Sequence, residues 1–78
     1  MSTWYRFHLD ETIKAMAISD SRRFFVRVRE PEGQHRNPLE FYRWHLKDAQ
    51  EAADRVVHLY YPHECNDQTC GTWRKSDS

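Results

Sequence analysis

The sequence predicts an α+β fold, with an antiparallel sheet of three to four strands, one amphipathic helix packed on one face and an irregular C-terminal tail. Two observations lead to this prediction. Residues 4–9, 22–30 and 40–47 alternate apolar and polar side chains with the period of two that is typical of strands. Residues 48–60 instead repeat apolar side chains with the period of a helix. A few strands and one helix are enough for a small two-layer domain.

The segments between these strands contain turn signals and one ambiguous stretch. Residues 10–12 read as a turn, and residues 13–18 form a short, largely apolar run. We expect this run to be a second strand, because it is short for a helix, although a short helix is the alternative. Residues 31–38 hold two prolines and a glycine and predict an exposed loop. Residues 40–47 could also begin the helix early, because Pro38 suits a first helical turn.

The helix is expected at residues 48–60. Asp48 stands at the N-cap position, and Glu51 three residues later completes a pair that resembles a capping box. Pro62 ends the helix. Its apolar stripe consists of Ala49, Ala52, Ala53, Val56, Val57 and Tyr60.

At 78 residues the chain has room for one domain. We place that domain at residues 1–62, followed by an irregular tail at residues 63–78 that contains Cys65 and Cys70, with Trp73 as its anchor. No apolar run approaches the length of a membrane span, and the first residues lack the features of a signal peptide. We therefore expect a cytoplasmic protein that does not enter a membrane.

One helix can cover only one face of the predicted sheet. We expect the apolar sides of the strands to face it, namely Tyr5/Phe7/Leu9, Phe24/Val26/Val28 and Tyr42/Trp44/Leu46. The opposite face would be left to water, to a partner or to a second copy of the chain, so a homodimer is an alternative. This face supplies the candidate partner-binding residues Trp4, Arg6, Arg23, Phe25, Arg27, Arg29, Phe41 and Arg43.

A surface of aromatic and arginine side chains favours binding, because these residue types are enriched in protein interfaces. We predict a non-enzymatic binding module that engages a larger protein or ribonucleoprotein assembly as an inhibitor or adaptor. Phage-encoded anti-defence proteins, including anti-CRISPR proteins, have this general character, by analogy of size and style without a shared motif. The alternative is a nucleic-acid-binding module that uses the same face, since aromatic rings stack on bases and arginines contact phosphates.

The formal net charge of zero, from twelve basic and twelve acidic residues, argues against that alternative. Catalysis has little support in the sequence. It contains no Gly-x-Ser-x-Gly, no His-Glu-x-x-His and no glycine loop that could hold a phosphate. We therefore predict no catalytic residues.

The tail contains candidate metal ligands. His63, Cys65 and Cys70 could supply three donors to a zinc ion, with His58 or His35 as the fourth. The spacing is not that of a standard zinc finger, so the sequence favours no metal or other cofactor. A Cys65–Cys70 disulfide and a pair of free thiols are the rivals. A small zinc-stabilised domain is thus a further alternative for the role of the chain.

Overall fold

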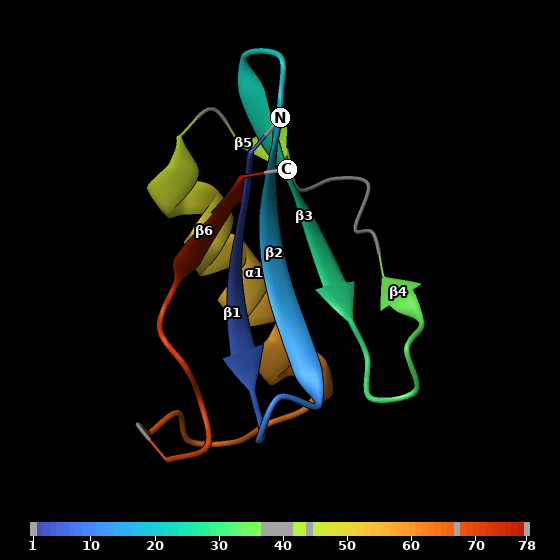
Figure 1. Cartoon of the computed structure of the whole chain (residues 1–78). Coiled ribbons are helices and arrows are strands. Elements are labelled where there is room, and N and C mark those ends of the chain that lie inside the picture. Colours follow the sequence, from blue (N-terminus) through green and yellow to red (C-terminus); the bar gives the residue numbers. More distant parts are fainter. Residues whose placement is uncertain (1, 37–41, 44, 67, 78) are drawn as a thin grey trace.

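The computed structural model describes residues 2–36, 42–43, 45–66 and 68–77. An antiparallel sheet carries one helix, α1 (Leu46–Tyr60), against one of its faces (Figure 1). The predicted α+β class is therefore confirmed. The strands are β1 (Ser2–His8), β2 (Ile13–Asp20), β3 (Arg23–Arg29), β4 (His35–Arg36), β5 (Tyr42–Arg43) and β6 (Arg74–Asp77).

The sheet is larger than predicted. Within the described residues its strands follow the order β4-β3-β2-β1-β6, which makes five, and β5 also pairs with β3. The extra strands could not be recognised from hydrophobic alternation. β5 lies within the strand predicted at residues 40–47, but β4 has only two residues and β6 reads Arg-Lys-Ser-Asp without an apolar side chain. Pairing of such strands adds backbone hydrogen bonds but buries little apolar surface.

The ambiguous run at residues 13–18 lies in a strand, as expected. β2 pairs with β1 on one side and with β3 on the other, so the three strands form a meander. The turn between β1 and β2 places Leu9, Asp10 and Glu11 at φ values of 50°, 56° and 69°. Residues other than glycine adopt this left-handed backbone conformation with some strain.

The helix begins earlier than predicted. His45 occupies the N-cap position without a side-chain hydrogen bond, and Asp48 lies inside the first turn, so the predicted N-cap is wrong. In the first turn a carboxylate still interacts favourably with the helix dipole. The strand predicted at residues 40–47 is described only at β5, because residues 40–41 and 44 lie outside the described residues. The alternative of an early helix start is correct for Leu46 and Lys47.

The core lies between α1 and the central strands. The predicted apolar stripe is buried, except that Tyr60 is 49% exposed. The alanines at the start of the stripe let the helix approach the sheet closely. The buried apolar residues of the core are Ile13, Ala15, Ala17, Val26, Val28, Ala49, Ala52, Ala53, Val56 and Val57.

The faces of β1 are the reverse of those predicted. Trp4 packs against the core, and Arg6 and His8 contact α1, so these side chains lie beneath the helix. Tyr5 and Phe7 lie on the opposite face, because neighbouring residues in a strand point to opposite sides. The prediction failed because it assigned polar side chains to solvent. Asp54 on α1 instead supplies both Arg6 and His8 with a partly buried polar partner.

The tail is not irregular throughout. β6 pairs antiparallel with β1, so the two ends of the chain lie side by side at one edge of the sheet (Figure 1). Trp73, just before β6, packs against the core, as its predicted role of anchor requires. Among the described residues, no helix combines the length and the apolar character needed to cross a membrane.

Candidate metal centre

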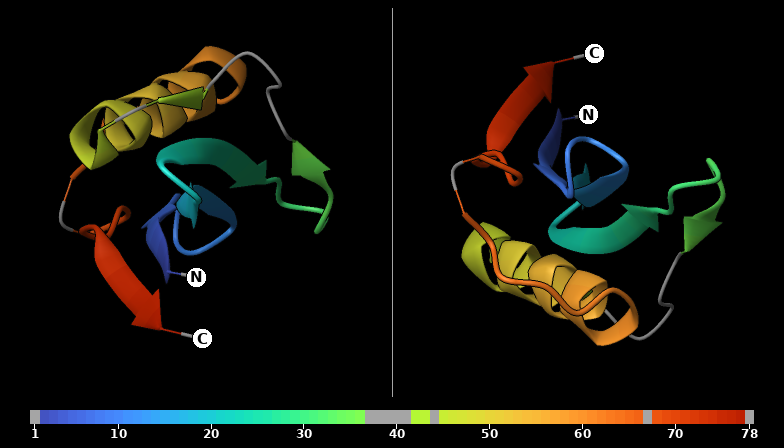
Figure 2. Two further views of the ribbon diagram at one scale, coloured as in Figure 1. Left: turned by 90° about the horizontal axis from the view of Figure 1, so that it is seen from above. Right: turned by 90° about the horizontal axis from the view of Figure 1, so that it is seen from below.

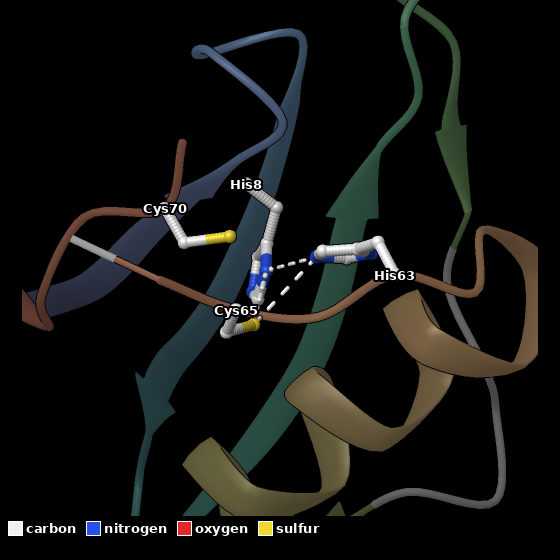
Figure 3. Close-up of side chains that lie close together, drawn as sticks. All are labelled: His8, His63, Cys65 and Cys70. Carbon is white, nitrogen blue, oxygen red and sulfur yellow. Dashed lines mark hydrogen bonds between the residues drawn. The ribbon is translucent and has the colours of Figure 1, made fainter. Parts of the chain in front are cut away.

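Four side chains with metal-binding atoms converge where β1 ends. His8, His63, Cys65 and Cys70 each offer one ligand atom, and these atoms all lie within 4.8 Å of one another (Figure 3). His8 is fully buried and Cys70 is buried. Three of the four are the candidates that the tail sequence predicted. The fourth is His8, whereas the sequence had offered His58 or His35.

Local backbone bonds bring the two cysteines to β1. The Oδ1 atom of Asn66 accepts hydrogen bonds from the backbone N–H groups of Gln68 and Thr69, at 2.9 and 3.1 Å. The N–H of Cys70 donates to the carbonyl of Asn66 at 2.9 Å, which closes a tight turn between the cysteines. The next residue, Gly71, donates its N–H to the carbonyl of Phe7 at 2.9 Å. Cys70 is thereby fixed beside the end of β1.

Outer hydrogen bonds orient both histidine rings. Nε2 of His8 lies 2.9 Å from Oδ1 of Asp54, and Nδ1 of His63 lies 2.6 Å from the carbonyl oxygen of Tyr61. Carboxylate and carbonyl oxygens only accept, so each of these ring nitrogens carries a hydrogen. In neutral rings, Nδ1 of His8 and Nε2 of His63 then both present lone pairs. These two atoms are 3.1 Å apart, a repulsive arrangement unless a proton or a metal ion lies between them.

The sulfur of Cys65 lies next to these two nitrogens. It is 3.4 Å from Nδ1 of His8 and 3.6 Å from Nε2 of His63. His58, on α1, approaches the same sulfur from outside the four-residue group, with Nε2 at 3.2 Å. Burial and the nearby His63 lower the pKa of His58, which favours its neutral ring. A neutral His58 can donate a hydrogen bond to the sulfur.

The two thiols differ in their acidity. Burial, together with a hydrogen bond to Cys70, raises the pKa of Cys65 to about 11. Burial also opposes ionisation of Cys70, but hydrogen bonds from the backbone N–H of Leu9 and from Cys65 outweigh it and lower that pKa to about 6. Both cysteines are free in the structure. The lowered pKa favours the thiolate of Cys70, and the raised pKa favours the thiol of Cys65. The thiolate is the form that binds metals.

Asp54 connects the centre to the rest of the fold. Besides His8, its carboxylate accepts hydrogen bonds from Nη1 of Arg6 at 3.0 Å and from Nε1 of Trp73 at 3.3 Å. Burial acts to raise the pKa of Asp54, but the hydrogen bond from His8 and the charge of Arg6 prevail and lower it. An ionised carboxylate therefore stands behind His8. The arrangement as a whole could hold a metal ion.

The predicted partner-binding residues are divided by the structure. The strand β3 residues Arg23, Phe25, Arg27 and Arg29 lie on the face that α1 leaves uncovered, as predicted. Trp4 and Arg6 instead lie on the face that α1 covers. Phe41 lies outside the described residues, and Arg43 is described only as a backbone partner of Phe24.

Sequence reasoning missed His8 and Asp54. His8 is far along the chain from the other three candidate ligands, and in the sequence Asp54 resembles any exposed acidic residue of an amphipathic helix. The one available signal was the polar side of the first strand, where His8 follows Arg6 at a spacing of two.

Comparison with known proteins yields no match: no family model matches the chain, and neither a curated protein nor a solved structure matches it.

Proposed function

We propose that the protein is a small binding module whose fold is stabilised by a structural zinc ion held by His8, His63, Cys65 and Cys70. The observation that carries this proposal is the orientation of the two histidine rings. Each ring uses its outer nitrogen in a hydrogen bond and turns the other nitrogen toward the thiols. Zinc-binding histidines characteristically have such an outer partner, which is a carboxylate or a backbone carbonyl.

The distances among Nδ1 of His8, Nε2 of His63 and Sγ of Cys65 support zinc. Bond lengths of about 2.05 Å to nitrogen and 2.3 Å to sulfur in a tetrahedron place two nitrogens roughly 3.3 Å apart and a nitrogen and a sulfur roughly 3.6 Å apart. The corresponding separations here are 3.1 Å between the nitrogens and 3.4 and 3.6 Å to the sulfur of Cys65. A set of two thiolates and two imidazoles also suits zinc better than the harder magnesium or calcium ions.

The composition of the site supports a structural rather than a catalytic ion. Four protein donors fill a tetrahedron, whereas a catalytic zinc keeps one position open for water or substrate. His8 and Cys70 are also buried, which limits access. We propose, accordingly, a non-enzymatic protein. Zinc would link the end of β1 to the segment after α1, and small domains often need such a link because their cores are limited.

The binding role is proposed for the uncovered face of the sheet, where β3 presents arginines and an aromatic ring. The more specific role of an inhibitor or adaptor stays a prediction.

Metal analysis combined with thermal unfolding tests the proposal. We expect about one zinc ion per chain, and we expect both a chelator and the double substitution Cys65→Ser with Cys70→Ser to lower the melting temperature strongly, since zinc-binding free energy becomes folding free energy. His35→Gln is the matched control, because it removes an exposed histidine outside the centre. Zinc-free protein that melts at the same temperature with chelator and with both serines would contradict the proposal.

A further inference from the structure

The sheet face that α1 does not cover carries rings and cations in rows. Antiparallel partners share a face, so the register places Tyr5 in line with Arg27, through Met16, and Phe7 in line with Lys14 and Arg29. Phe25 lies in the adjoining row. We call Tyr5, Phe7, Lys14, Phe25, Arg27 and Arg29 the open sheet face. Among the described residues no helix lies against it (Figure 2).

The cations of this face lie against its rings. Nζ of Lys14 is 4.8 Å from the centre of the Tyr5 ring and 5.7 Å from that of Phe7. Cζ of Arg27 is 5.5 Å from the centre of the Phe25 ring. Cation–π contacts of this kind hold the rings and the charges at fixed positions beside one another. All six side chains are partly exposed.

The open sheet face is predominantly positively charged. The register adds Arg23 and Arg74 to its basic side chains, and it adds one carboxylate, Asp20, at the end of β2 opposite Arg23. The chain as a whole has a formal net charge of zero, so its acidic residues are concentrated elsewhere. The open sheet face is therefore complementary in charge to an anion, although the protein as a whole is neutral.

We infer that the open sheet face binds single-stranded nucleic acid. Exposed bases can stack on Tyr5, Phe7 and Phe25, while the phosphates between them pair with Lys14, Arg27 and Arg29. An acidic protein would satisfy the cations but would leave the alternating rings without a specific partner. A duplex is a poor fit, because its grooves are read by a protruding helix or a two-stranded ribbon rather than by a broad sheet. The inference gives a partner class to the proposed binding module and needs the zinc ion only to keep the fold intact.

Fluorescence anisotropy with labelled oligouridine and oligothymidine tests the inference. Strands of roughly 12 nucleotides suit the size of such a face. We expect binding that weakens steeply with salt, because phosphate contacts release counterions. Arg27→Glu should weaken binding by at least about tenfold, and Tyr5→Leu by at least about fivefold, since one stacked base is lost. The matched controls on α1, Arg55→Glu and Tyr60→Leu, should bind like the wild type.

Three results would overturn the inference. These are the absence of binding at low salt, equal weakening by the α1 controls, and equally tight binding of labelled polyglutamate that Tyr5→Leu does not affect. The last result would assign the face to acidic polypeptides. Zinc content is measured in the same samples, so the two proposals fail separately. Zinc-bound protein that does not bind oligonucleotides would contradict only this inference. Zinc-free protein that binds them would contradict only the structural zinc site.

Discussion

Nε2 of His8 lies 2.9 Å from Oδ1 of Asp54, although 46 positions separate the two residues in the chain. The same carboxylate accepts from Arg6 and from Trp73. One acidic side chain in the middle of α1 thus joins the first strand, the helix and the segment before the last strand. If the centre holds zinc as proposed, its position behind His8 predicts a role in metal affinity as well as in folding.

Asp54→Asn should weaken zinc binding by about 10- to 100-fold, the usual effect of removing an outer carboxylate partner. The amide keeps the shape of the side chain but loses the charge that polarises His8. Competition with a chromophoric chelator measures the affinity. Asp48→Asn, an exposed site on the same helix, is the control and should change little. Equal zinc affinity in Asp54→Asn and wild type would remove Asp54 from the centre.

The substitutions His8→Gln and His58→Gln should show which of the two histidines is the fourth zinc ligand. Nε2 of His58 is 3.2 Å from the sulfur of Cys65, but His58 lies outside the four-residue group. We expect His8→Gln to lose stoichiometric zinc in native mass spectrometry and His58→Gln to retain it. The opposite pattern would make His58 the ligand, which is one of the two candidates for the fourth ligand that the sequence offered.

Val57→Asp should destabilise the domain by roughly 3 kcal/mol or more, because it buries an unpaired carboxylate. Val57 is completely buried in the core, whereas Leu59, two residues further on the same helix, is 72% exposed. Leu59→Asp is therefore the matched control and should unfold at nearly the wild-type denaturant concentration. Similar unfolding midpoints for both variants would mean that α1 does not pack as described.

Glu30 should contribute to stability in a pH-dependent way. It accepts hydrogen bonds from Nε of Arg36 at 2.6 Å and from the hydroxyl of Tyr61 at 2.9 Å, and these bonds lower its pKa below the ordinary value of 4.5. A carboxyl group with a lowered pKa in the folded state stabilises the fold above its unfolded pKa. That contribution is lost as the pH falls through the folded pKa.

Glu30→Gln should therefore melt at a lower temperature than the wild type at pH 7. The difference should close below pH 4.5, as the wild-type carboxyl becomes protonated. Thermal melts of both proteins from neutral to acidic pH measure the difference in melting temperature. Any destabilisation by metal loss that both proteins share drops out of this difference. A difference that is constant over the whole range would contradict the assignment.

The fold class could be predicted because it rests on periodicity. The alternation of β3 and the apolar stripe of α1 are properties of local sequence, and both predictions are confirmed. The faces of β1 could not be predicted in this way, since both of its sides contain aromatic rings. On the buried side Asp54 pairs with Arg6 and His8, a contact between distant parts of the chain that no local pattern indicates.

The candidate site was predicted in part for a related reason. His63, Cys65 and Cys70 are close in sequence, so their grouping is local. His8 joins them through the hydrogen bond from the N–H of Gly71 to the carbonyl of Phe7 and through the pairing of β6 with β1. β6 contains no apolar residue, so nothing in its pattern indicates this pairing.

X-ray absorption at the zinc K-edge of the purified protein is the most direct test of the central claim. The account predicts a first shell of two sulfurs at about 2.3 Å and two nitrogens at about 2.0 Å, from Cys65, Cys70, His8 and His63. A shell that contains only oxygen and nitrogen, or protein that binds no zinc at neutral pH, would contradict it.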